Sequence, residues 1–266
     1  MRGRLYRDRR VLCFAARRAC YDAAVNAPSR ARGAVEPIVD PPALPAARIL
    51  RLRVAAAGLP PDTARPGAAR PGESIVLVGG IGRGGAAVLA AACGAWLGRR
   101  VPPADLVQAA GWPDGPGWDV AAIAARLDSL AAAGNDHPAL GASFALGDGG
   151  LARACHAIAR ASDAGLWIDA GTVPLHAATA RICDALGLNP LEVQSGGALL
   201  ATAMPSVART CVEQLSADGF DAVIVGKVVA GPASVTLAVG GTQRPLGCPE
   251  RDAVDAILGV EPPAAA

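Results

Sequence analysis

Apolar and polar positions follow two different periods along this 266-residue chain, and the changes of period mark the expected elements. Apolar residues at positions 120, 123, 124, 127 and 130 recur at helical spacing, which predicts a helix with Asp119 capping its first turn. Short apolar runs bounded by glycine or polar residues predict buried strands. The expected helices cover residues 86–97, 119–133, 150–161, 177–186 and 207–215. The expected strands cover residues 75–78, 142–146, 166–168, 198–203, 222–225 and 234–239.

This interleaving of helices and strands predicts an α/β fold of the α+β layered kind, in which a mixed sheet is packed with helices. Hydrophobic residues make up 52% of the chain, but aromatic residues make up only 3%. The core must therefore be built from small aliphatic side chains. Because small side chains let helices approach a sheet closely, we expect tight helix-on-sheet packing.

Four segments are expected along the chain. Residues 1–47 combine scattered arginines with a proline cluster and no sustained periodicity, which predicts an irregular or disordered Arg/Pro-rich segment whose removal leaves the rest intact. Residues 48–72 are interpreted as a remnant strand, over residues 49–57, followed by a linker rich in Pro, Gly and Arg. The main domain is predicted over residues 73–240. Residues 241–266 are expected to form a C-terminal helix and tail.

The net charge of +2 conceals an asymmetry between the two ends of the chain. The first 70 residues hold fourteen arginines against five acidic residues, whereas the remainder holds eleven basic and eighteen acidic residues. An arginine-rich segment can contact nucleic acid or an acidic surface, but the chain has a single lysine, Lys227, so a bias toward arginine explains the same numbers. No aromatic residues are interleaved for base stacking, and we predict no nucleic-acid partner.

Seven cysteines are spread along the chain without a C-x-x-C pair, which argues against a structural zinc site and a disulfide framework. No secretory core and no run of about 18 apolar residues is found, so no membrane partner is expected. We therefore predict a cytoplasmic protein with reduced thiols and no metal site of its own. The three histidines are not paired at helical spacing, and no G-x-S-x-G motif suggests a nucleophile.

Three glycine-rich turns stand beside expected strands, at residues 79–85, 147–150 and 195–197. A glycine turn that opens a helix presents free N–H groups and the positive end of the helix dipole, which together form an anion site. The alternative is that these glycines only permit tight turns. Arg83, in the first turn, either meets an anion or is a solvated loop residue. The candidates for ligand or phosphate binding are Gly147, Asp148, Gly149, Gly150, Ser195, Gly196 and Gly197.

Taken in order, these turns and the segment from Gly187 through Asn189-Pro190-Leu191 to the 195–197 turn resemble the C-terminal half of the aminoimidazole-ribonucleotide (AIR) synthase superfamily, over about residues 71–240. The resemblance is nearest to the hydrogenase-maturation and AIR-synthase-related proteins, and it implies a PurM-like C-terminal domain. It further implies ATP and magnesium as cofactors, and ATP-dependent activation of an amide or carbonyl-type oxygen. The candidate turn residues would line the cleft, and a homodimer or a complete paralogous partner is implied.

The chain also departs from the pattern of that superfamily. Ala145 stands where the common form of the motif has its first Asp. The resemblance does not extend over the N-terminal quarter, where the superfamily usually carries its acidic nucleotide and magnesium motif, and no catalytic base can be named. A second hypothesis is therefore a degenerate, non-catalytic binding or assembly protein of the same superfamily.

Overall fold

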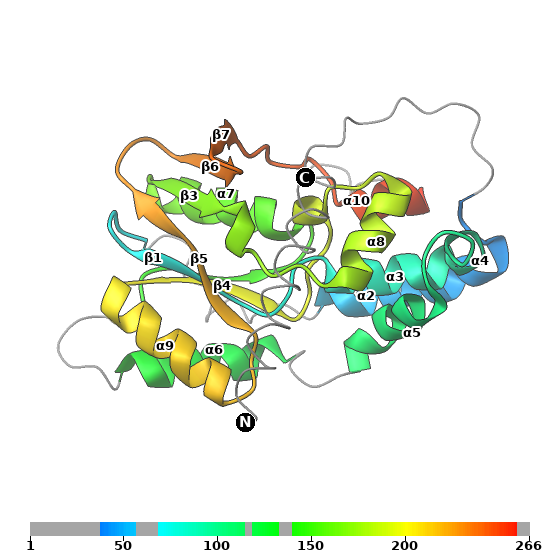
Figure 1. The fold of residues 1–266 in the computed structure, drawn as a ribbon, viewed down its shortest axis with the longest axis horizontal. Coiled ribbons are helices and arrows are strands. Elements are labelled where there is room, and N and C mark those ends of the chain that lie inside the picture. Colours follow the sequence, from blue (N-terminus) through cyan, green and yellow to red (C-terminus); the bar gives the residue numbers. More distant parts are fainter. Residues whose placement is uncertain (1–37, 57–68, 115–118, 133–139, 260–266) are drawn as a thin grey trace, which may run out of the picture.

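The structure, a computed structural model, describes residues 38–56, 69–114, 119–132 and 140–259. Their central element is a mixed sheet with the strand order β2-β4-β1-β5-β3-β6-β7 (Figure 1). Neighbouring strands are antiparallel except for β3 and β6, which are parallel. The strands are β1 (Ser74–Val78), β2 (Ser143–Leu146), β3 (Gly165–Asp169), β4 (Ala198–Ala203), β5 (Ala222–Val229), β6 (Ser234–Val239) and β7 (Thr242–Pro245).

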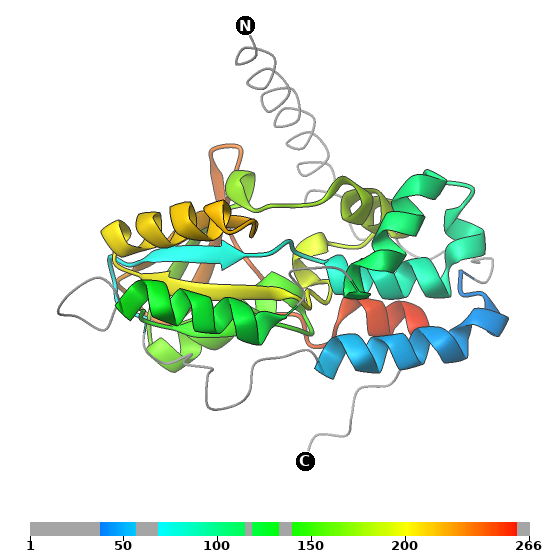
Figure 2. The ribbon, with the colours of Figure 1, turned by 90° about the horizontal axis from the view of Figure 1, so that it is seen from below.

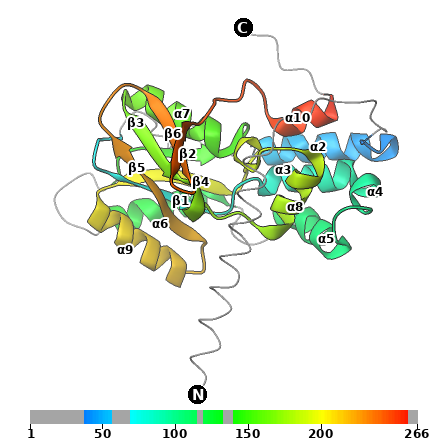
Figure 3. The same ribbon diagram turned by 45° about the horizontal axis from the view of Figure 1, so that its top comes forward.

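Helices cover both faces of this sheet, and a further group of helices lies beside it (Figures 1 and 2). Helices α6 and α9 cover one face, and α7 packs on the other. Figure 3 shows α2, α3, α4, α5, α8 and α10 gathered at one end of the sheet. The α-helices are α2 (Leu44–Ala56), α3 (Arg83–Ala92), α4 (Gly94–Leu97), α5 (Pro103–Gly111), α6 (Val120–Ala132), α7 (Gly150–Ser162), α8 (Ala177–Leu186), α9 (Pro205–Ala217) and α10 (Ala253–Leu258).

The core divides in the same way, into one apolar cluster on each face of the sheet and one within the helix group. Adjacent residues of β1 supply both sheet faces, because Ile75 and Leu77 point into the α7 side while Val76 and Val78 point into the α6/α9 side. A Cβ atom added at Gly85 of α3 would lie 2.3 Å from Val193 Cγ1. This close approach is the small-residue packing that the composition predicts.

The predicted α/β class is confirmed, and every expected strand and helix of the main domain that lies in the described residues has a counterpart. Asp119 caps α6 as predicted, since its Oδ1 accepts from the Ala122 N–H at 3.0 Å. Helix α5 and strand β7 were not predicted. Strand β5 runs past Gly226 to Val229. A Cβ at Gly226 would lie 2.0 Å from the Trp167 carbonyl oxygen on β3. A glycine that looks like a strand end is thus required by a close approach between strands.

The strand expected at residues 49–57 is wrong, because Leu44–Ala56 form helix α2. The strand was expected because this segment is short and mostly apolar, but Leu52 is 72% exposed while the neighbouring Arg51 is buried. The prediction of an irregular segment is also wrong for residues 38–47, which contain η1 (Pro41–Ala43) and the first turn of α2. Residues 1–37 and 57–68, which include most of the predicted linker over residues 58–72, lie outside the described residues. No helix in the described ranges is long and apolar enough to cross a bilayer.

Candidate functional site

The three glycine turns meet at one end of the sheet. Strands β1, β2 and β4 are neighbours, and the turns follow β1, follow β2 and precede β4. The Gly82 N–H donates to Ser195 Oγ at 2.7 Å, and the Ser195 N–H donates to the Gly147 carbonyl oxygen at 3.1 Å. The candidate turns at residues 147–150 and 195–197 are therefore in direct contact.

Tight packing explains several of the glycines in these turns. Gly150 has a φ of 56°, and a Cβ there would lie 2.5 Å from the Val193 carbonyl oxygen. Gly79 has a φ of 90°, and its Cβ would lie 2.6 Å from the Gly197 carbonyl oxygen. Gly150, Gly79 and the buried Gly197 therefore join the turns to one another. A side chain at Gly79 or Gly150 would collide with a backbone carbonyl oxygen, so close packing explains the glycine at these two positions.

The Ser195 hydroxyl is fully buried and has two partners within the chain. It accepts from the Gly82 N–H at 2.7 Å and donates to the Val193 carbonyl oxygen at 2.8 Å. It therefore fixes the position of two turns. Gly196, beside it, is buried as well.

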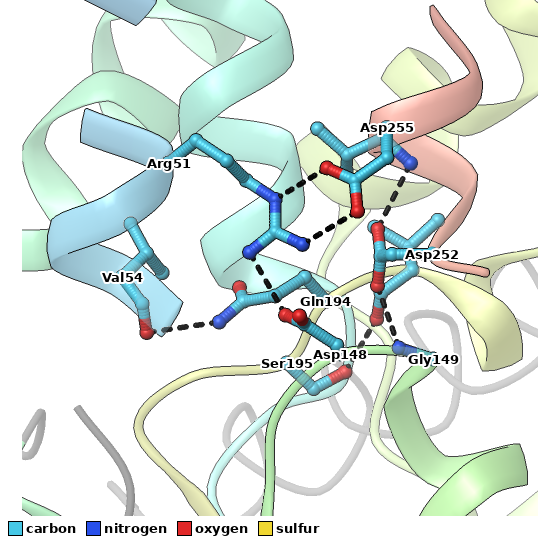
Figure 4. A network of polar contacts seen from close by, with 10 residues as sticks. Arg51, Val54, Asp148, Gly149, Gln194, Ser195, Asp252 and Asp255 are labelled. Atoms are coloured by element: carbon cyan, nitrogen blue, oxygen red, sulfur yellow. Dashed lines mark hydrogen bonds and ion pairs between the residues drawn. The ribbon is translucent and has the colours of Figure 1, made fainter. Parts of the chain in front are cut away.

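A carboxylate from the far end of the chain occupies the N-terminus of α7. Asp252 Oδ2 accepts from the Gly149 N–H at 2.7 Å, while its Oδ1 accepts from the Val254 N–H at 2.9 Å and caps α10 (Figure 4). Only 1% of Asp252 is exposed. Burial raises the pKa of this carboxyl to about 6, against the two backbone hydrogen bonds, which lower it. The turn at residues 147–150 is thus a site that holds an oxyanion, supplied here by the chain itself.

Arg51 joins three segments around this carboxylate (Figure 4). Its guanidinium Nε and Nη2 each lie 2.9 Å from a carboxylate oxygen of Asp255 on α10, and Nη1 lies 2.8 Å from Asp148 Oδ1. Burial alone would lower the pKa of Arg51, but its hydrogen bonds to Asp255 and Asp148 raise it above its ordinary value. The Arg51 side chain is 8% exposed and that of Asp148 is 40% exposed, so the network reaches solvent at Asp148.

Gln194 and Arg83 complete the surroundings of the turns. The Gln194 Nε2 donates to the Val54 carbonyl oxygen at 3.0 Å, which ties α2 to the 195–197 turn. The Arg83 guanidinium lies 5.2 Å from the centre of the Trp112 ring. Burial lowers the pKa of Arg83, while Asp221 acts to raise it. Arg83 is therefore half-buried against an aromatic ring, which neither hypothesis from the sequence anticipated.

All seven candidate residues lie together, but Arg51, Asp252 and Asp255 were missed. Asp252 carries a local signal, because an Asp directly before the apolar residues of a short helix is a typical N-cap. Arg51 carries none, since a charged residue within an apolar run is normally exposed. In the part of the chain that the structure describes, no group of three or more His, Cys, Asp or Glu side chains is placed to hold a metal ion.

Residues 70–238 match the family model described as "AIR synthase related protein, C-terminal domain". Among curated proteins, the carbamoyl dehydratase HypE of Rhizobium leguminosarum bv. viciae is 31% identical over 183 residues, which are 67% of this chain and 47% of that protein. The chain thus spans about half the length of this relative.

Solved structures support the same fold. A hydrogenase maturation protein HypE in complex with ATP aligns with a TM-score of 0.56 and 20% identity, over 71% of this chain and 54% of that one. A chain of a HypE–HypF complex aligns with a TM-score of 0.52 and 20% identity, over 69% of this chain and 55% of that one. At these identities the likeness concerns the fold, which is PurM-like as predicted.

Proposed function

Because the chain belongs to the AIR synthase related protein family, whose C-terminal domain it carries over residues 70–238, we propose that it is a hydrogenase-maturation-factor-like protein that binds ATP at the 147–150 turn. In this proposal, it uses ATP to activate an amide or carbonyl-type oxygen. The similarity to HypE proteins, one of them solved with ATP, supports the choice of nucleotide.

The observation that carries the proposal is the oxyanion already present on the turn. The Gly149 N–H donates to a carboxylate oxygen at 2.7 Å, at the N-terminus of the 13-residue helix α7. A phosphate oxygen needs the same donor and the same positive end of a helix dipole. Arg51, close by, adds a cation that is held in place by Asp255 on the neighbouring helix α10.

ATP would supply the phosphoryl group, and the chain would bind and orient it. The Gly149 amide is the donor suited to hold a phosphate oxygen, and the Arg51 guanidinium, which pairs with Asp255 and Asp148, adds positive charge beside it. The carboxylates of Asp148, Asp252 and Asp255 do not fit a resident magnesium site, because they are committed to Arg51 and to backbone N–H groups. We therefore assign no step to magnesium.

The second candidate is a non-catalytic binding or assembly protein. One observation favours it: the Ser195 hydroxyl has both of its hydrogen-bond partners within the chain. In this version the protein acts in the cytoplasm with a second copy of itself or with a complete paralogous partner. The complex of HypE with HypF is a precedent for assembly in related proteins.

Titration calorimetry with ATP tests the nucleotide, with ADP and adenosine as matched ligands. Phosphate recognition at the turn predicts that affinity falls from ATP to ADP and is lost with adenosine, which has the base but no phosphate. Equal affinity for the three ligands, or no heat with ATP, would contradict the proposal. An assay of ADP release in the presence of amide compounds then separates the candidates, because the assembly protein binds without turnover.

A further inference from the structure

The loop between β7 and α10, residues 247–252, covers the N-terminus of α7. Two contacts hold this loop on the helix. The Gly149 N–H donates to Asp252, and Arg153 Nη2 donates to the carbonyl oxygens of Pro249 at 3.0 Å and Glu250 at 2.9 Å. Residues 247–251 form no helix or strand. Hydrogen bonds of the Asp252 and Arg153 side chains therefore hold the loop on α7, and no backbone pairing of a strand or helix does so.

The helix that follows the loop is anchored independently of these contacts. Val254 and Leu258 of α10 are buried in the apolar cluster of the helix group, and Asp255 pairs with Arg51. Movement of the Asp252 carboxylate thus breaks its hydrogen bonds with the Gly149 and Val254 N–H groups, without exposing the apolar side of α10. Helix α10 thus holds the C-terminal end of the loop in place, whereas the hydrogen bond between Asp252 and Gly149 can open.

The contact of Asp252 is incompatible with a phosphate at the same place. The Gly149 N–H has a single hydrogen, and the buried carboxylate already takes it. Two anions in contact also repel each other, and Asp148 already adds negative charge beside Asp252. An anionic ligand can use this donor only after Asp252 has moved away.

We propose that residues 247–252 form an autoinhibitory latch, in which Asp252 occupies the phosphate position at the N-terminus of α7 and must be displaced before ATP binds. The inference rests on the proposed function, because it concerns access to the same turn. The latch makes nucleotide affinity depend on the position of this loop. Any partner that draws the loop away from α7 would raise the affinity of the protein for ATP.

The Asp252→Asn variant tests the latch. Asn is an equally good N-cap, so its Oδ1 can keep the Val254 N–H, while its NH₂ group faces the Gly149 N–H as a second donor and releases the turn. We expect the Kd for ATP to fall by about tenfold, in line with the loss of one hydrogen bond to a charged group. Glu250→Gln is the matched control, because it removes the same charge from the same loop at an exposed side chain.

Amide hydrogen exchange on the unchanged protein gives a second readout. Saturating ATP should speed exchange at the Val254 amide, whose acceptor on Asp252 moves, and leave the strands unchanged. If the wild type and Asp252→Asn bind ATP equally, or if Glu250→Gln gains as much affinity, the latch is wrong and the proposed function stands. If no form of the protein binds ATP, the proposed function is wrong, and the latch, which depends on it, is wrong as well.

Discussion

Some residues of this site have two roles, of which only one can be recognised in the sequence. Asp252 caps α10, and it also places an anion on the first turn of α7, more than one hundred residues away in the chain. The cap follows from local spacing, whereas the second contact depends on the fold. Glycines behave in the same way. The turns at residues 79–85 and 147–150 are evident in the sequence, but the carbonyl oxygens that require glycine at Gly79 and Gly150 belong to Gly197 and Val193, which are far away in the chain.

A pair of glycine substitutions separates backbone conformation from close packing. Gly72 and Gly79 have nearly the same φ, 94° and 90°, but a Cβ at Gly72 has no atom within 4 Å, whereas one at Gly79 lies 2.6 Å from the Gly197 carbonyl oxygen. Gly72→Ala should cost roughly 1–2 kcal/mol of unfolding free energy, because alanine is strained at positive φ. Gly79→Ala should cost about 1–3 kcal/mol more, because the turns must move apart.

Urea denaturation of the two glycine variants measures this difference. Equal losses would mean that the 79–85 and 195–197 turns can separate freely, and close packing would then not explain the glycine at position 79. The Gly72 variant also serves as the control for general effects of the substitution, since its turn lies away from the site.

At the scale of elements, the apolar pattern predicted most helices and strands but failed at α2. The failure has a physical cause, because the stripe of α2 that faces the helix group contains an arginine instead of an apolar residue. Burial of a cation is tolerated there only because Asp148 and Asp255, from two other elements, neutralise it. A single sequence does not reveal such partners. Strand β7 was missed for a different reason, since all four of its residues are exposed and show no alternation.

Two arginines on α2 provide a matched test of this account. Arg51→Met should lower the free energy of unfolding by about 3–5 kcal/mol, because it leaves two carboxylates without their buried cation. Arg53→Met should change it by less than about 1 kcal/mol, because Arg53 pairs with Asp114 at 2.8 Å on the surface, with exposed fractions of 56% and 73%. Denaturation midpoints of the two variants measure the contrast. Similar values would show that the Arg51 network contributes little to the position of α2.

At the scale of the whole molecule, the α/β class and the PurM-like resemblance could be predicted, because they follow from the order of strands, helices and turns. The assembly of the site could not be predicted. It brings together residues near both ends of the described chain, Arg51 and Asp252, on turns that lie between them in the sequence. Such long-range pairs leave no periodic signal. The segments before and after the main domain therefore took part in the site, although the sequence pattern set them apart from it.

The position of α2 reverses the expectation that residues 1–47 can be removed without effect. Ala47 is fully buried, and the Asp40 N–H donates to the Ala92 carbonyl oxygen at 2.8 Å. Three further aliphatic side chains pack against the apolar cluster of the helix group: Ile38, Val39 and Leu44. Compared with a chain that begins at residue 38, one that begins at residue 48 should lose about 2–4 kcal/mol, the value of a few half-buried aliphatic side chains. Its melting temperature should fall by roughly 5–15 °C. Scanning calorimetry on the two truncated chains isolates residues 38–47, and equal melting temperatures would show that the first turn of α2 is dispensable for the fold.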